Sequence, residues 1–196
     1  MFDVVIIGGA MIGSSVAWFL SHNDDFDGRI LVVERDPTYE KSSTAHTNSC
    51  MRQQFSSELN IRISQFAADF VRDFRDYMGG DPAVPDLHVH HFGYMYLADN
   101  ETFASRLKQS HAIQAACGAG TRLMSPGEIS AAYPFYQLDD IVLGSHNIVD
   151  EGYFDGATMF DWWRRKARQK NVCYIANEVV DIGIDAGRVT DITLAS

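Results

Sequence analysis

Residues 8–13 form a glycine-rich turn of the type that lies against phosphate groups, and an acid follows at a spacing that suits a nucleotide. Glycine lets the backbone pass close to a pyrophosphate, and the free N–H groups of a following helix attract its negative charge. Glu34 stands where the dinucleotide fingerprint needs an acid to accept hydrogen bonds from a ribose. The turn consists of Gly8, Gly9, Ala10, Met11, Ile12 and Gly13. These residues predict a dinucleotide-binding site.

One position departs from the usual fingerprint. Ala10 stands where the second glycine of the pattern normally lies. Its methyl group is expected at the closest approach of the backbone to the pyrophosphate. We therefore expect Ala10 to weaken binding without abolishing it.

The elements around the turn are those of a βαβ unit. Val4–Ile7 is a wholly apolar run, an apolar helical pattern continues to Leu20, and Ile30–Glu34 is a second apolar run. Short apolar runs bounded by glycine are typical of parallel strands that are covered on both faces. The sequence therefore predicts an α/β protein with a Rossmann-like parallel sheet, although a doubly wound sheet without a nucleotide is the plainer alternative.

A polar loop follows Glu34 and contains Ser43, Thr44, His46 and Arg52. Solvated surface is the plain interpretation, but hydroxyls placed directly after the ribose acid are expected to face the phosphates of the same dinucleotide. Arg52 is the best local candidate for binding a substrate carboxylate or for tuning a cofactor, because its guanidinium binds bidentately. An ordinary salt bridge is the open alternative for Arg52.

Four stretches of the chain together carry a family resemblance: residues 4–13, the pair Glu34 and Arg35, residues 43–56, and residues 93–98. They resemble the FAD-dependent oxidoreductases of the D-amino-acid oxidase superfamily, above all the branch with glycine oxidase, sarcosine oxidase and dimethylglycine dehydrogenase. The resemblance covers nearly the whole chain, with specific motifs in its first part. It implies a Rossmann-like FAD-binding domain and part of a second, α+β substrate-binding domain.

The resemblance also implies roles for single residues. Glycines of the turn would line the pyrophosphate, Glu34 would hold the ribose, and the residue matching Val179 would contact the adenine through its backbone. His46 falls where one branch links its flavin covalently, and an ordinary loop histidine is the alternative. The implied catalytic residues are Arg52 and His46. The implied FAD-binding residues are Gly8, Gly9, Ala10, Met11, Ile12, Gly13, Glu34, Arg35, Ser43, Thr44, His46 and Val179.

The predicted domains are residues 1–84 for the first FAD-binding segment, residues 85–147 for part of a substrate domain, and residues 148–196 for a return to the FAD-binding domain. Because members of the resembled family continue further, the chain is interpreted as the N-terminal half of a longer enzyme. Helices are predicted over residues 58–78, 101–117 and 155–170, a strand over 87–97, and a hairpin over 179–194. The residues of the first helix that are predicted to face the core are Leu59, Ile63, Phe66, Ala67, Phe70, Phe74 and Tyr77.

Composition narrows the function further. The formal net charge of −10 argues against nucleic acid as a partner. No apolar run reaches the length of a membrane span, and the first strand begins too early to leave room for a targeting peptide. A cytoplasmic location is therefore expected. The three cysteines follow no pairing pattern, and His88 with His90 lacks a third ligand, so no metal site is predicted.

The resemblance implies oxidation of a C–N bond in an amino acid or N-methylated amine, with hydride transfer to flavin. The sequence offers no acid–base pair. This is compatible with amine oxidation, because a neutral amine gives up hydride without a protein base. A nucleotide-binding or assembly protein without turnover is one alternative, favoured by Ala10 and by the incomplete chain. An NAD-dependent dehydrogenase is another, although Ser43 and Thr44 favour FAD. The substrate is expected to be a small molecule, and the oligomeric state and the electron-accepting partner stay open.

Overall fold

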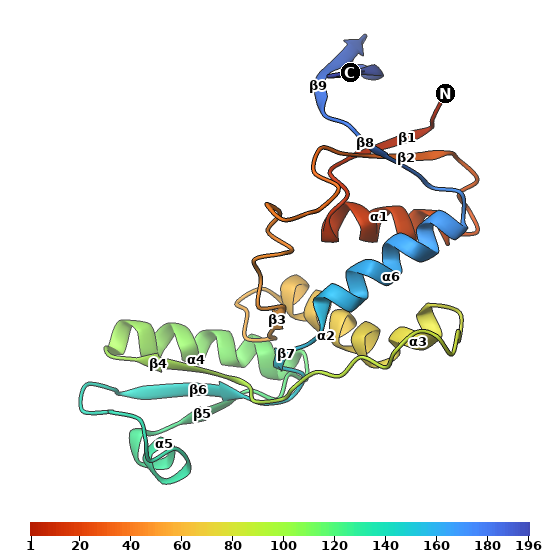
Figure 1. Ribbon diagram of the computed structural model, residues 1–196. Coiled ribbons are helices and arrows are strands. Elements are labelled where there is room, and N and C mark those ends of the chain that lie inside the picture. The colour runs from red at the N-terminus through yellow and green to blue at the C-terminus, as the bar shows by residue number, and fades with distance from the viewer. The chain divides into compact units, whose positions relative to one another are not determined.

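The computed structural model describes residues 1–196, which form two compact units (Figure 1). The first unit combines residues 1–47 with residues 156–196, and the second comprises residues 48–155. The predicted FAD-binding segment, residues 1–84, is longer than the first part of that unit, because residues 48–84 pack within the second. Compact units follow packing whereas the predicted domains follow ligand binding, so the domain assignment stays a prediction.

The first unit contains a three-stranded parallel sheet in the order β1-β2-β8. Its central strand is the most buried, since Ile30, Leu31, Val32 and Val33 are each at most 6% exposed. Figure 1 shows α1 and α6 on the same face of this sheet, and the two helices pack against each other. The prediction of an α/β fold with a parallel βαβ unit is confirmed. The elements are β1 (Val4–Ile7), α1 (Met11–Ser21), β2 (Ile30–Glu34), α6 (Gly156–Gln169) and β8 (Cys173–Ala176).

The core between the two helices is aromatic and tightly packed. Ala17 on α1 and Ala167 on α6 are fully buried, which lets the helices approach closely. Trp18 and Trp163 are less than 9% exposed, and the rings of Phe19 and Trp163 lie 6.5 Å apart. Burial of side chains of this size is the main stabilising contribution to such a unit.

A hairpin completes the first unit, as predicted from the sequence. The strands β9 (Val179–Asp185) and β10 (Arg188–Leu194) pair antiparallel. The two residues between them, Ala186 and Gly187, have φ angles of +47° and +76°. Two consecutive residues with positive φ are what a tight two-residue hairpin requires.

The second unit contains an antiparallel sheet in the order β4-β6-β5, which contacts α4 and α5, and a short β3-β7 pair. The predicted start of α4 is confirmed, because the side chain of Asn100 accepts a hydrogen bond from the N–H of Phe103 at 2.9 Å. The capping box at α5 is also present, with Ser125 and Glu128 bonded reciprocally. The elements are β3 (Cys50–Met51), β4 (Tyr94–Ala98), α4 (Glu101–Ala116), β5 (Arg122–Met124), α5 (Pro126–Ala132), β6 (Leu143–Asn147) and β7 (Gly152–Tyr153).

The prediction of one continuous helix over residues 58–78 is wrong. The structure has α2 (Glu58–Arg72) and α3 (Phe74–Tyr77), separated at Asp73, whose φ and ψ are −100° and 22°. The predicted core stripe is also only partly correct: Phe70 and Phe74 are buried, whereas Leu59, Ile63, Phe66 and Tyr77 are 68%, 55%, 50% and 40% exposed. Periodicity identifies an apolar face, whereas tertiary packing decides how much of that face is covered.

The predicted strand over residues 87–97 is shorter than expected, because only Tyr94–Ala98 forms a strand in the sheet. His90 makes an isolated bridge with Tyr153 instead, and their rings stack at 4.4 Å. The three cysteines are free thiols. No helix is both long and apolar enough to cross a membrane, and no cluster of three or more potential metal ligands occurs.

Candidate nucleotide-binding site

The glycine turn follows β1 directly and fixes the start of α1. Gly8 has a φ of +92°, a conformation that residues with a Cβ rarely adopt, and its N–H donates a 2.8 Å hydrogen bond to the carbonyl of Val33. A Cβ atom on Gly13 would overlap the carbonyl oxygen of Gly8. The third glycine of the motif is therefore required by the contact between α1 and the turn.

Ala10 adopts a backbone conformation that any residue accepts. Its φ and ψ are −70° and −161°, so the missing glycine causes no strain at this position. The alanine is compatible with the turn itself, and its expected effect on nucleotide affinity stays a prediction.

The residue before α1, Ala10, has no side chain that could accept hydrogen bonds from the backbone N–H groups at the N-terminus of the helix. Instead, the N–H of Met11 donates a 3.1 Å hydrogen bond to the hydroxyl of Thr44, which lies 33 residues later. The first turn of α1 carries no acidic side chain to offset the positive end of its dipole. An anion would find there both free N–H groups and a favourable potential.

Glu34 joins the turn to the loop after β2. One carboxylate oxygen accepts a hydrogen bond from the N–H of Gly9 and the other from the N–H of Asp36, each at 2.8 Å. These bonds place the acid at the end of β2, beside the glycine turn. This is the location that the sequence predicted for the ribose-binding acid.

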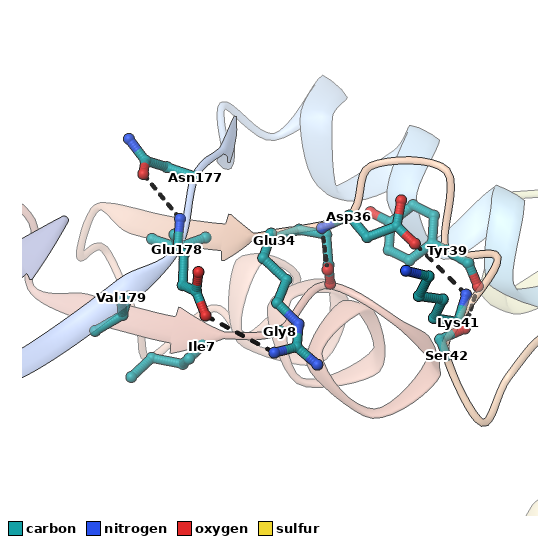
Figure 2. A pocket seen from close by; sticks show the side chains of 12 residues that line it. Ile7, Gly8, Glu34, Asp36, Tyr39, Lys41, Ser42, Asn177, Glu178 and Val179 are labelled. Atoms are coloured by element: carbon teal, nitrogen blue, oxygen red, sulfur yellow. Dashed lines mark hydrogen bonds and ion pairs between the residues drawn. The ribbon is translucent and has the colours of Figure 1, made fainter. Parts of the chain in front are cut away.

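A cavity of about 330 Å³ opens at this end of the sheet (Figure 2). Three segments line it: the end of β1, residues 33–42 and residues 177–179. Arg35 forms a 3.8 Å ion pair with Glu178 at the cavity. The volume falls in the range typical of small-molecule sites. The lining residues are Ile7, Gly8, Val33, Glu34, Arg35, Asp36, Tyr39, Lys41, Ser42, Asn177, Glu178 and Val179.

The structure brings together four of the predicted FAD-binding residues at this cavity: Gly8, Glu34, Arg35 and Val179. The other predicted residues of the first unit lie outside its lining, with Thr44 at the start of α1 and Ser43 and His46 exposed. Sequence reasoning missed Tyr39, Lys41 and Asn177. Only the proximity of Tyr39 and Lys41 to Glu34 in the sequence signals such a role.

Arg52 belongs to the second unit, where no carboxylate pairs with it. Its guanidinium lies 4.8 Å from the ring centre of Phe55, and its Nε atom is buried without a hydrogen-bond partner. Tyr94 is nearby: burial, together with a hydrogen bond to the side chain of Cys50, raises its pKa to about 12, and the charge of Arg52 opposes this. No salt bridge involves Arg52 within this chain, and its role stays a prediction.

A buried acid, Glu151, fixes the segment that follows Arg52, and the sequence analysis missed it. Its side chain is fully buried and accepts hydrogen bonds from the N–H of Gln53 at 2.7 Å, and from the side chains of Gln54 and Asn147 at 3.0 Å each. Burial raises the pKa of Glu151, while these donors oppose the shift. A single acid before a glycine carries no sequence signal that distinguishes it from a surface residue.

Comparisons with known proteins agree with this geometry. The sequence model of the FAD dependent oxidoreductase (DAO) family matches residues 3–195. The FAD-dependent oxidoreductase domain-containing protein 1 of Xenopus laevis is 35% identical over 183 residues, which is 91% of this chain and 36% of that protein. The chain thus spans little more than a third of the length of such curated relatives.

Solved structures share the fold. The L-proline dehydrogenase from P. horikoshii matches 98% of this chain and 49% of its own, with a TM-score of 0.78 and 21% identity. The glycine oxidase from Bacillus cereus matches all of this chain and 52% of its own, with a TM-score of 0.70 and 18% identity. Taken with the glycine turn, Glu34 and the cavity, the match over nearly every residue assigns this chain to the FAD dependent oxidoreductase (DAO) family.

Proposed function

We propose that this chain binds FAD through its first unit, and that the protein to which it belongs oxidises the C–N bond of an amino acid or N-methylated amine. The observation that supports this proposal most strongly is the position of Glu34, which lies beside the glycine turn and lines the cavity. A parallel βαβ unit with an acid at this point is the arrangement that recognises the adenosine half of a dinucleotide.

The residues present fit that adenosine half. Glu34 would accept hydrogen bonds from the ribose, and the apolar side chains of Ile7, Val33 and Val179 would flank the adenine. The diphosphate would be held at the start of α1, where the hydroxyl of Thr44 now accepts the N–H of Met11. Ser43 and Arg35 would complete the phosphate and adenosine contacts.

The second unit would supply substrate contacts. When bound, FAD supplies the hydride acceptor. Arg52 has no acidic partner to neutralise it, so its guanidinium is suited to the carboxylate of an amino-acid substrate. Amino acids, namely glycine and L-proline, are also the substrates in the names of the structurally similar glycine oxidase and L-proline dehydrogenase.

His46 is proposed as a residue near the flavin, without a covalent bond to it. Its side chain is exposed, and its backbone N–H bonds the carbonyl of Ser43. FAD-loaded protein that is precipitated with acid should therefore give a colourless pellet. A pellet that stays yellow, and is colourless in His46→Ala, would instead establish a covalent link.

A nucleotide-binding or assembly protein without turnover is the second candidate. The observation that favours it is Ala10, which stands where the fingerprint has its second glycine and is expected to weaken cofactor binding. Binding without turnover would then be the property of this chain. For either candidate, we propose that the protein is located in the cytoplasm.

Calorimetry with FAD, ADP and NAD tests the proposal. The chain should bind FAD and ADP, and Glu34→Ala should weaken both by the loss of charge-assisted hydrogen bonds, each about 1.5–3 kcal/mol. Glu40→Ala is a matched control, because Glu40 is exposed and lies outside the cavity lining. Equal affinity of the wild type and Glu34→Ala for ADP would rule out the ribose role, and tighter binding of NAD than FAD would favour a dehydrogenase.

A further inference from the structure

Arg164 on α6 is a cation that has no acidic partner. Its guanidinium carbon lies 4.7 Å from the ring centre of Tyr39 and 5.1 Å from that of Phe160. Its Nε atom is buried and makes no hydrogen bond. The next residue, Arg165, differs in all these respects, since it is more than half exposed and forms a 2.6 Å ion pair with Asp161. The charge of Arg164 is therefore directed at two aromatic rings.

Tyr39 is held in a conformation that a tyrosine rarely adopts. Its φ is +59°, and it is only 7% exposed. Bulky residues in the left-handed region are strained, and such strain persists only where the surroundings impose it. The ring packs edge-on against Phe160 with centres 4.9 Å apart, and Arg164 lies over its face. These contacts fix Tyr39 from the side of α6.

Tyr39 in turn organises the loop that reaches the start of α1. Its carbonyl accepts hydrogen bonds from both the N–H of Ser42, at 3.0 Å, and the hydroxyl of Ser42, at 2.7 Å. Ser42 then accepts the N–H of Ala45, which encloses Ser43 and Thr44 in a turn. The hydroxyl of Thr44 meets the N–H of Met11 at the end of this path.

The ring of Tyr39 also contacts the glycine turn itself. A Cβ atom on Gly9 would lie 3.2 Å from the Tyr39 hydroxyl, so the ring extends to the glycine turn. Tyr39 lines the cavity as well. The same side chain therefore connects α6, the glycine turn and the loop that carries Ser43 and Thr44.

We propose that Arg164 is a positioning residue for the phosphates of the bound nucleotide. Stacked on Tyr39, it holds residues 39–44 so that Thr44 stays at the N-terminus of α1. This inference rests on the proposed function, because it concerns the diphosphate of the same dinucleotide. Arginine is suited to this role because a planar guanidinium stacks on aromatic faces, which the compact ammonium group of lysine does not do.

The test compares ADP with adenosine in Arg164→Met, Arg164→Lys and the control Arg165→Met, by calorimetry well below each melting temperature. Adenosine uses the cavity and Glu34, whereas ADP also uses Ser43 and Thr44, which lie outside the cavity lining. Arg164→Met should lose about tenfold in ADP affinity, a loss in the range of a desolvated cation–π contact. Its affinity for adenosine, and both affinities of Arg165→Met, should stay within about twofold of the wild type.

The lysine variant keeps the proposal testable if the methionine variant does not fold. Arg164→Lys retains the charge and most of the stem, and it should still lose about threefold in ADP affinity alone, because the planar stack is gone. Unchanged ADP affinity in the folded variants would overturn the inference. So would an equal loss for adenosine and ADP, which would mean that Arg164 only supports the fold. A wild-type chain that binds neither ligand would instead overturn the proposed function itself, and the inference with it.

Discussion

The hydroxyl of Thr44 accepts a 3.1 Å hydrogen bond from the N–H of Met11, the first residue of α1. A side chain distant in the sequence thereby satisfies a donor that the preceding residue, Ala10, leaves uncapped. The loop after β2 and the N-terminus of the helix thus act together. A phosphate bound at this point would have the Thr44 hydroxyl and the helix donors as neighbours.

Thr44→Val removes that acceptor and keeps the shape of the side chain. We expect the free energy of unfolding to fall by about 0.5–1.5 kcal/mol, the usual net contribution of such a hydrogen bond. ADP affinity should fall as well, because the variant also lacks a hydroxyl for the phosphate. Chemical denaturation and calorimetry measure the two effects. Thr193→Val, at an exposed position of β10, is the control, and equal losses in both variants would contradict this role for Thr44.

Gly13→Ala tests the contact between α1 and the glycine turn. The added Cβ would overlap the carbonyl oxygen of Gly8, so backbone must move against backbone, and we expect a loss of at least about 2 kcal/mol in stability. Gly127→Ala in α5 meets nothing within 4 Å and should raise stability by up to about 1 kcal/mol. Thermal unfolding of both variants decides the matter, and a stable Gly13→Ala would mean that the turn yields easily.

Ala10→Gly should tighten FAD binding and lower stability. The methyl group is expected at the closest approach of backbone to pyrophosphate, so its removal improves that contact. Because φ at Ala10 is an ordinary −70°, glycine brings no relief of strain and only loosens the unfolded chain, at a cost of about 0.5–1 kcal/mol. Affinity and melting temperature should therefore move in opposite directions. FAD affinity no better than that of the wild type would show that the turn already accommodates the methyl group.

Glu151 predicts a specific pH dependence of stability. Burial raises the pKa of the Glu151 carboxyl above the ordinary value of 4.5, so this carboxyl binds its proton more tightly in the folded state than in the unfolded state. Its contribution is then fully present below pH 4.5 and is lost as the pH rises through the folded pKa. The difference in unfolding free energy between the wild type and Glu151→Gln should shrink over that window.

Chemical denaturation at a series of pH values measures this difference. Glu101→Gln, an exposed change on α4, is the control. If the difference between the wild type and Glu151→Gln grew with rising pH, the donors from Gln53, Gln54 and Asn147 would outweigh burial, and the pKa of Glu151 would be lowered instead.

The part of the nucleotide site that lies within residues 1–34 can be predicted from the sequence alone. Apolar runs, glycines at a fixed spacing and an acid at the end of the second run have local physical causes, namely strand burial, a positive φ at Gly8 and the approach of Gly13 to the turn. The start of α4 at the N-cap Asn100 and the capping box at Ser125 can also be predicted from the sequence, because a cap and its partner lie within one helical turn.

Tertiary packing determines which distant residues join this local unit. Residues 177–179 enter the cavity wall because β8 pairs with β2, and Arg164 reaches Tyr39 because α6 packs beside α1. In the second unit it placed Glu151 against Gln53, and it left Leu59 exposed although its spacing predicts burial. Contacts across about a hundred residues leave no periodic pattern in a sequence, since each depends on how whole elements pack and not on the preferences of neighbouring residues.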